Sequence, residues 1–557
     1  MLTRRRILGI TALAALAARL LFFLEWLDSP YRCFHRVPGL DMETLLRMSE
    51  WGGGAGFPPI FTFHRVLIHL IWRFHGFRHS VEALFLIQSL LGVGSALLVA
   101  DLALLLYRRR RAALAVGVLA ACYAPFLLYE SAVLQESSTL FLILAAFWML
   151  IAARRRAFAP LRAFAAGTLL AFASLGRPVA LGFALVSLPW SAVWLRRRSL
   201  PLRRLAPLAA GIALVLGGAA LFNGVAGGDP DPFFKVTRYA LSAAGGNDAA
   251  SAGASAGEPA PLPVLAERIL KGIVFSFSPA EFPENLNCRY LCGKIPLLKW
   301  LPGPFALFPF ALLGMFLIFS SGAWRSRPGW LLLPLLSLIV PLAVRGPIDR
   351  YRLILIPYLM LAVPMIFALK RRREFQLAAG ALFAAVCVAA APRLPLRAAD
   401  DFTWALALEA KNGGRPDAES MRHIAAAWRK APGEVKYPVS LALRHRSRGE
   451  RTSAEAVLRF AAARDGRNAP VCSYYLGVLR FETGDATGAE RFLAAADPEA
   501  LPGELRFKSF FMRSECAARR GDAPTAAEFA RRALSLRDGS PAMREFLRRR
   551  LPASAAN

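Results

Sequence analysis

The chain carries carboxylates and arginines in the polar stretches that separate its long apolar segments. A carboxylate can accept a proton as a general base or hold a divalent cation, and a guanidinium forms paired hydrogen bonds with phosphate oxygens. A base beside a phosphate clamp at a membrane surface suits chemistry on a lipid phosphate. The residues concerned are Asp41, Glu43, Glu130, Glu136, Arg177, Glu281, Glu284, Asp349, Arg350 and Arg352.

Each of these residues also has a simpler structural interpretation. Asp41 and Glu136 can cap the helices that follow them, and Arg177 and Arg350 can be helix-end arginines that reach into the interface. Arg19 and Glu25 lie toward the outer end of the first apolar segment, where an ionisable side chain needs a partner or a water-filled cavity. Chemistry is favoured because loops far apart in sequence bring carboxylates and arginines to one level of the membrane.

The elements that must position these residues are membrane helices. Hydrophobic residues make up 56% of the 557 residues, which excludes an ordinary soluble protein. The formal charge of +31 comes largely from clusters separated by pairs of apolar segments, so all of them can face the cytoplasm. This topology explains the charge, and we predict no nucleic-acid partner. The clusters are Arg4–Arg6, Arg108–Arg111, Arg154–Arg156, Arg196–Arg198, Arg325 with Arg327, and Lys370–Arg373.

The hydropathy pattern predicts about eleven transmembrane helices, some shorter than the ~20 residues that span a bilayer. The first is an uncleaved helix, because Glu25-Trp26-Leu27-Asp28 replaces a signal-peptidase site. With a cytoplasmic N-terminus the C-terminus lies outside. Segment 59–79 predicts an interfacial helix, and 251–263 a low-complexity loop. The predicted spans are 7–27, 81–106, 112–128, 140–153, 163–175, 179–195, 205–222, 305–320, 330–344, 353–369 and 375–391.

An internal repeat begins where the hydropathy falls, after Pro392. Gly413, Gly449, Gly484 and Gly521 are 36, 35 and 37 residues apart. Each is followed by alanines at fixed offsets, at 418, 454, 489 and 526 and again at 425, 461, 496 and 533. A glycine that ends one helix and alanines that let the next pack closely indicate an array near the tetratricopeptide period, with Trp404 and Phe510 as candidate large residues. The alternative is an irregular alanine-rich helical domain.

Five of the seven cysteines fall in segments predicted to face outward, where disulfides are permitted. Cys288 and Cys292 are four residues apart, as in a helical turn or a small loop. A disulfide, free thiols and a metal-binding pair all remain open for them.

Four stretches resemble the polytopic GT-C glycosyltransferases, the group that contains the lipid A aminoarabinose transferases and protein O-mannosyltransferases, and most of all its RgtA/B/C/D-like branch. The resemblance covers about residues 1–392. The stretches are Gly39-Leu-Asp41 with Gly52–Gly54 and Pro58-Pro59, then Tyr129-Glu-Ser-Ala-Val-Leu134-Gln-Glu136, then Leu175-Gly-Arg177-Pro178, and last Asp349-Arg-Tyr-Arg352 leading to Pro357. Glu281-x-Pro283-x-Asn285 is also similar to a loop of that branch.

The resemblance implies an inverting transfer of a sugar from a polyprenyl phosphate. Asp41 would be the base, Glu136 would assist it, and a divalent metal could bind Asp41 and Glu136. Arg177, Arg350 and Arg352 would hold the donor phosphate, with Glu43, Glu130 and Glu281 as further candidates. The sequence departs from the family at Leu45, where a Tyr is frequent, and at Pro59-Ile-Phe61, where Pro-Leu-Tyr is usual. Both departures lie where acceptor and donor would meet.

The sequence therefore predicts an all-α protein with two parts, a GT-C-like membrane domain at 1–392 and a tetratricopeptide-like, non-cytoplasmic domain at 393–557. We expect a bacterial inner-membrane enzyme whose partners are membrane lipid, a polyprenyl-phosphate sugar, a glycan, lipid or protein acceptor, and a protein bound by the repeats. The alternatives are a lipid-linked glycan transporter or flippase and a membrane scaffold. A transporter should show inverted repeats with broken helices near the midplane, and the sequence shows no such halves.

Overall fold

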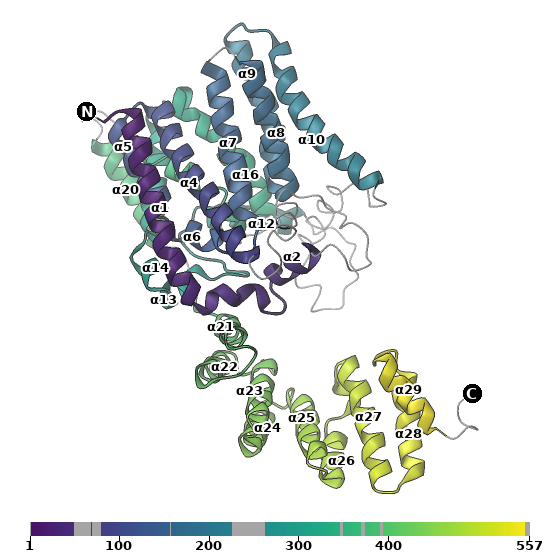
Figure 1. Cartoon of the computed structure of the whole chain (residues 1–557). Coiled ribbons are helices and arrows are strands. Elements are labelled where there is room, and N and C mark those ends of the chain that lie inside the picture. The colour runs from purple at the N-terminus through teal and green to yellow at the C-terminus, as the bar shows by residue number, and fades with distance from the viewer. Residues whose placement is uncertain are drawn as a thin grey trace. The chain divides into compact units, whose positions relative to one another are not determined.

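The structure is a computed structural model, and it divides the chain into two compact units. These are Met1–Pro395 and Leu396–Asn557, so the division lies three residues beyond the predicted boundary at 392 (Figure 1). The described residues form α-helices and 3-10 helices, with no strand among them. They are 2–49, 68, 80–155, 158–225, 262–345, 349–368, 374–389, 391 and 394–551.

The first unit is a polytopic α-helical membrane domain. Six of its helices are long and apolar enough to cross a bilayer, one bent pair gives a seventh span, and four shorter apolar helices complete the predicted set. The helices at the predicted positions are α1 (Arg4–Asp28), α4 (Ser80–Tyr107), α5 (Arg110–Ala121) with α6 (Ala124–Glu130), α7 (Glu136–Arg155), α8 (Pro160–Gly176), α9 (Val179–Arg197), α10 (Ala206–Val225), α15 (Pro304–Ser320), α16 (Leu332–Arg345), α18 (Ile356–Met360) with α19 (Pro364–Ala368), and α20 (Glu374–Ala389).

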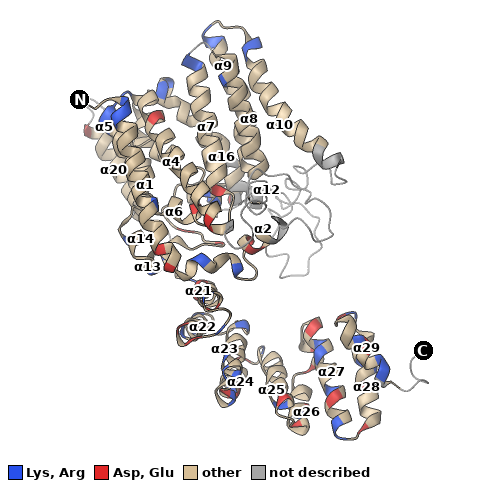
Figure 2. Ribbon diagram, in the orientation of Figure 1, with Lys and Arg blue, Asp and Glu red and all other residues tan. Residues whose placement is uncertain are grey.

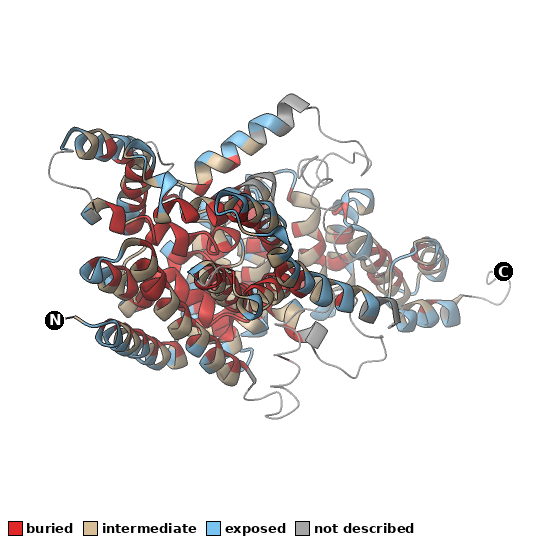
Figure 3. Cartoon of the chain, turned by 90° about the horizontal axis from the view of Figure 1, so that it is seen from above, coloured by how far each residue is buried: buried red, intermediate tan, exposed pale blue. Residues whose placement is uncertain are grey.

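The exposed faces of the membrane helices carry apolar side chains, as expected for surfaces that contact lipid. On α1, Leu13 and Leu20 are 69% and 61% exposed, whereas Ala15 and Phe22 are fully buried. Buried residues fill the middle of the helical unit and exposed ones lie around its rim (Figure 3). Because lipid supplies no hydrophobic drive between helices, close packing must hold them together.

Small residues supply that close packing. A Cβ on Gly167 of α8 would overlap the Leu208 carbonyl of α10, and a Cβ on Gly211 of α10 would overlap the Phe164 carbonyl of α8. The two backbones therefore touch along a seam where only glycine fits.

The third span is broken, although the hydropathy predicted one helix over 112–128. Helices α5 and α6 meet at an angle of 45°. Pro125 lies in the first turn of α6 and has no N–H to continue the helix. The guanidinium of Arg19 donates to the carbonyl of Ala121 over 3.1 Å and satisfies a group that the break releases.

The tenth predicted span, 353–369, is also not one helix. It contains α18 and α19, preceded by the short helix α17 (Asp349–Arg352). Pro357 and Pro364 each remove a backbone donor, and the chain turns between the segments instead of continuing. These breaks let the arginines of α17 face the interior of the unit.

Groups of Lys and Arg lie at one end of the membrane unit, and both acidic and basic residues lie toward the other. Figure 2 shows Lys and Arg at the end where α1 begins and α9 ends, which we call the basic end. The acidic residues around α2 (Asp41–Ser49) and α6 lie toward the opposite end. The grouping of Lys and Arg at one end is what the positive-inside pattern predicts.

The second unit is a series of helices in which each packs against the next in sequence. Gly413, Gly449, Gly484 and Gly521 all follow a helix with φ between +66° and +82°, a conformation that favours glycine. Ala454, Ala461, Ala489, Ala496 and Ala533 are buried in it, whereas Ala418 is exposed and Ala425 and Ala526 are half-buried. Its helices are α21 (Ala398–Lys411), α22 (Ala418–Lys430), α23 (Lys436–Ser447), α24 (Arg451–Arg464), α25 (Ala469–Glu482), α26 (Ala486–Ala495), α27 (Gly503–Arg519), α28 (Ala523–Ser535) and α29 (Pro541–Arg550).

Some sequence predictions concern residues outside the described part of the chain. These are the interfacial helix at 59–79, apart from Ile68, most of the low-complexity loop at 251–263, and the Gly52–Gly54 and Pro58-Pro59 stretches.

Candidate active site

Four segments position the candidate residues opposite the basic end. Asp41 opens α2 after a turn at Gly39, whose φ of +83° is left-handed. Glu136 opens α7, and Arg177 is the residue that ends α8. Arg350 lies in α17, which faces the loop between α12 (Leu262–Ser276) and α13 (Cys288–Lys294). An acidic residue in a first helical turn, like Asp41 and Glu136, is favoured by the helix dipole.

Arg350 is the centre of the first group of contacts. Its guanidinium forms an ion pair with Asp41, another with Glu284 at 2.5 Å, and donates to the Tyr351 hydroxyl at 2.9 Å. Asn285 adds a reciprocal contact, since its amide donates to Asp41 Oδ2 at 3.0 Å and accepts from the Asp41 N–H at 3.3 Å. The 277–287 loop is thus joined to both α2 and α17.

Glu136 and Arg177 form the second group, and Tyr351 joins it to the first. Arg177 donates to Glu136 through Nη2. The guanidinium carbons of Arg177 and Arg350 lie 4.8 Å and 4.9 Å from the centre of the Tyr351 ring. A ring contacted by two cations favours both of them through its negative face. We call the series Glu136, Arg177, Tyr351, Arg350 and Asp41 the ionic chain.

The ionic chain is buried at one end and open at the other. The Glu136 side chain is 1% exposed and that of Arg350 is 7% exposed, whereas the Asp41 side chain is 49% exposed. Asp41 Oδ2 accepts from both Arg350 and Asn285, and Oδ1 accepts from no described residue. Arg177 Nε is buried with no acceptor in the described part of the chain. A buried donor without a partner points to a water or a ligand.

Electrostatics keep Asp41 ionised. Burial alone would raise the pKa of this carboxyl, but the hydrogen bonds from Arg350 and Asn285 and the positive charges of Arg350 and Arg177 hold it below its usual value.

Arg352 lies apart from the ionic chain. Its guanidinium pairs with Asp349 at 2.6 Å, donates to the carbonyl of Ser278, and lies 5.2 Å from the Phe308 ring centre. These contacts use the guanidinium of Arg352 within the protein. The sequence grouped Arg352 with Arg177 and Arg350, and the structure separates it from them. Its geometry fits a residue that positions the 277–287 loop.

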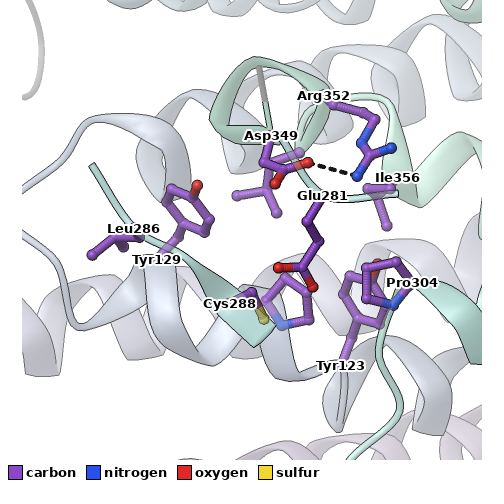
Figure 4. A pocket seen from close by; sticks show the side chains of 11 residues that line it. Tyr123, Tyr129, Glu281, Leu286, Cys288, Pro304, Asp349, Arg352 and Ile356 are labelled. Carbon is purple, nitrogen blue, oxygen red and sulfur yellow. Dashed lines mark hydrogen bonds and ion pairs between the residues drawn. The ribbon is translucent and has the colours of Figure 1, made fainter. Parts of the chain in front are cut away.

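Glu281 lies in a small pocket beside Arg352. Figure 4 shows its carboxylate in the middle of this pocket, with Asp349 and Arg352 on one side and Tyr123 and Cys288 on the other. Glu281 Oε2 accepts the Arg289 N–H at 2.8 Å. Burial and the nearby charge of Asp349 raise the pKa of Glu281 to about 7. Cys288 Sγ lies 3.7 Å from Cys292 Sγ, and both are free thiols.

Glu130 and Glu43 do not join the ionic chain. Glu130 pairs with Arg19 at 2.6 Å, and both side chains are 4% exposed. A Cβ on Gly92 of α4 would overlap this pair, so a glycine opposite it makes the room. Glu43 is two residues beyond Asp41 on α2, and residues at that spacing face different sides of a helix. Glu25 accepts the Leu297 N–H at 2.9 Å and caps α14 (Pro296–Trp300).

The two carboxylates predicted to hold a metal are each paired with an arginine. Among the described residues, no group of three or more His, Cys, Asp and Glu has the arrangement of a metal site. The arginines already balance the charges of Asp41 and Glu136. A divalent cation bound to these two carboxylates stays a prediction.

Three members of the site were given no role from the sequence: Glu284 was one of the ionisable candidates, and Tyr351 and Asn285 were only parts of the family-like stretches. Tyr351 joins the two arginines, and Glu284 and Asn285 hold Arg350 and Asp41. The signal was present, since Tyr351 lies between two arginines and Glu284-Asn285 lies in an acidic, proline-containing loop. Single-sequence reasoning could not tell which of these polar neighbours turn inward.

No protein-family model and no curated protein matches the chain. Among solved structures, one that matches is ArnT from Cupriavidus metallidurans bound to undecaprenyl phosphate. It is 14% identical, the match covers 95% of this chain and 80% of that one, and the TM-score is 0.40. A likeness at this level carries no argument about the site.

Proposed function

We propose that this protein is a membrane glycosyltransferase that moves a sugar from a polyprenyl-phosphate donor to an envelope acceptor. The reaction would occur at the outer face of the bacterial inner membrane, opposite the basic end. The observation that carries the proposal is the ionic chain, which joins a half-exposed carboxylate to two buried arginines.

Asp41 is the proposed base. It is ionised at neutral pH, one of its oxygens is held by Arg350 and Asn285, and the other has no partner among the described residues. A fixed carboxylate with one free oxygen can orient an acceptor hydroxyl and take its proton. Arg350 makes the Asp41 carboxylate a weak base. A weak base is sufficient if the acceptor proton moves late, because the hydroxyl becomes more acidic once its oxygen is bonding to carbon.

Arg177 is the proposed contact for the donor phosphate. Its Nη2 is held by Glu136, and its Nε–H has no acceptor among the described residues. Phosphate oxygens are the acceptors that a guanidinium fork fits best. Arg350, joined to it through Tyr351, would add positive charge on the same side.

The residues named above can account for every bond that forms or breaks in the transfer and for the proton that moves. The acceptor oxygen bonds to the anomeric carbon from the face opposite the phosphate, while the bond from that carbon to the phosphate oxygen breaks. The electron pair leaves with the phosphate, whose growing charge Arg177 and Arg350 stabilise. The acceptor proton passes to Asp41. Attack from the opposite face inverts the anomeric centre.

We propose that the second unit has a binding role and no catalytic role. It is a helical array with buried alanine seams and, in its described residues, no cluster of potential metal ligands. We propose that it is tetratricopeptide-like, lies outside the cytoplasm, and binds a protein partner or the acceptor, as helical arrays commonly do.

Replacing Asp41 tests the base. Asp41→Asn should lower transfer from a polyprenyl-phosphate sugar by roughly 10²–10⁴-fold, because an amide cannot accept the proton. The measurement is radiolabelled sugar transfer by purified protein in nanodiscs, using total envelope extract as acceptor. Glu43→Gln, on the same helix but another face, is the matched control and should keep activity. Near wild-type transfer by Asp41→Asn would remove Asp41 as the base.

Replacing Arg177 tests the phosphate contact separately. Arg177→Lys keeps the charge opposite Glu136 but loses the fork, so donor binding should weaken while the fold is retained. Binding is measured by titrating a polyprenyl phosphate in nanodiscs and following intrinsic fluorescence. The exposed Arg36 gives the control variant Arg36→Lys, which should bind normally. Equal affinity in all three proteins would contradict the assignment.

A further inference from the structure

A second arrangement of arginines lies at the basic end and takes no part in the proposed reaction. Four arginines from three separate segments line one cavity of about 480 Å³. Arg154 and Arg155 come from the end of α7, Arg198 follows α9, and Arg327 opens η5 (Arg327–Leu331). The positive-inside rule explains why arginines occur at this end, but it does not require them to converge on a cavity.

The described residues do not compensate this convergence of like charges. In the described part of the chain, no acidic side chain forms an ion pair with Arg154, Arg155, Arg198 or Arg327. Burial and the charges of Arg108 and Arg155 also lower the pKa of Arg327. Like charges placed together repel one another, and a bound anion would relieve the repulsion.

Arg154 is held in place by aromatic side chains. Its guanidinium carbon lies 4.8 Å from the ring centre of Trp330 and 5.5 Å from that of Trp194. The two indoles contact each other at 6.3 Å, and Phe158 contacts Trp194 at 6.4 Å. Stacking fixes the plane of the guanidinium and leaves its N–H groups at the edge, where they can donate.

The turns at this end use unfavourable backbone conformations. Arg108, Phe158 and Ser199 have φ values of +58°, +66° and +53°, although none is glycine. They lie between α4 and α5, between α7 and α8, and after α9. A left-handed conformation is unfavourable for a non-glycine residue, so the surrounding packing must hold these turns. Arg198 is fixed next to one of them.

Apolar side chains line the cavity beside the arginines. Leu105 and Leu106 of α4 and Ile151 of α7 line it together with Trp194. A site that combines guanidinium groups with apolar side chains matches a molecule that has a phosphate head and an acyl chain. We propose that this cavity binds the phosphate group of an anionic phospholipid from the leaflet at the basic end.

Native mass spectrometry of the whole protein tests the proposal. Phosphatidylglycerol and phosphatidylcholine with the same acyl chains are titrated against wild type and Arg155→Gln/Arg198→Gln. Arg198 and Arg155 are exposed, so the fold should be retained. The double variant should bind phosphatidylglycerol roughly tenfold or more weakly, since each basic residue near a charged lipid contributes measurably. Binding of phosphatidylcholine should be weak in both proteins.

Arg196→Gln/Arg197→Gln is the matched control, because it removes two charges from the same end of α9 without touching the cavity. It should bind phosphatidylglycerol as wild type does. Equal losses in the two double variants, or a loss in neither, would overturn the proposal. A parallel titration with inorganic phosphate separates the sources: if it displaces phosphatidylglycerol and stabilises wild type alone, the site is a phosphate site but the lipid assignment is wrong.

Discussion

At the residue scale, two carboxylates near the candidate site have opposite environments. Asp41 is half-exposed and hydrogen bonded by Arg350 and Asn285, which lowers its pKa. Glu281 is enclosed with Asp349 nearby, which raises its pKa to about 7. Near neutral pH one is therefore charged and the other is close to its midpoint. When the environments of two carboxyl groups push their pKa values apart, one can stay ionised while the other holds a proton.

Glu281 should make stability depend on pH. Its folded pKa is above the value for an exposed carboxyl, so the folded state holds a proton that the unfolded state has released, and stability should fall as pH rises from about 4.5 through about 7. Glu281→Gln keeps the shape without the charge and should flatten this dependence. The measurement is the melting temperature in detergent at pH 5 and pH 8. The same fall in wild type and Glu281→Gln would refute the assignment.

At the element scale, broken helices and glycines make room for buried charge. The bend between α5 and α6 leaves the Ala121 carbonyl to Arg19, and Arg19 then pairs with Glu130. Gly92 on the neighbouring helix α4 provides the space. An ion pair in this position is costly to break, since removing one partner would leave a buried charge alone.

Gly92 should therefore resist even a small substitution. The Cβ of Gly92→Ala would overlap Glu130 and the guanidinium of Arg19, and neither side chain can move into solvent. Overpacking of this kind costs roughly 1–3 kcal/mol. The control is Gly9→Ala on α1, where nothing lies within 4 Å of the added Cβ. Melting temperatures in detergent should fall for Gly92→Ala only, and equal values for the two variants would contradict the packing argument.

At the scale of the whole molecule, the two units depend on different forces. The first exposes leucines such as Leu13 and Leu20 at its rim and packs with small residues inside. The second buries alanine-rich seams with larger side chains, as where Leu458 packs with Ala454 and Leu479. Charged residues occur along its helices (Figure 2), and many of them, such as Arg415, Glu419 and Arg422, are exposed, which suits water.

The second unit should fold without the first. Residues 396–557, produced alone, should be soluble and show helical circular dichroism with a cooperative melt, because its helices pack against their sequence neighbours. Trp404 is buried in this unit and its fluorescence reports folding, and Phe510 is buried and reports on the packing of the core. A product that is soluble yet unstructured would show that this unit requires the membrane domain.

Much of the architecture could be predicted because it depends on local patterns. Hydropathy indicated the spans, arginine clusters indicated a common end, and Gly413, Gly449, Gly484 and Gly521 marked helix ends. Bilayer thickness, the cost of moving charge and the left-handed preference of glycine each act on short stretches of sequence. Prolines at 125, 357 and 364 were visible too, but their effect on helix direction depends on the neighbours that satisfy the freed backbone.

The sequence by itself determined which residue types reach the candidate site, and the tertiary structure decided how they pair. Asp41, Glu136, Arg177 and Arg350 were all candidates from the sequence, and they form one ionic chain. Arg352 was predicted to hold the donor phosphate and Glu130 was a further candidate, yet their partners lie outside the ionic chain, 3 and 111 residues away in sequence. The fold chooses among such partners, because a charge can pair with any opposite charge within reach, whether in the same short helix, as for Arg352, or in a helix distant in sequence, as for Glu130.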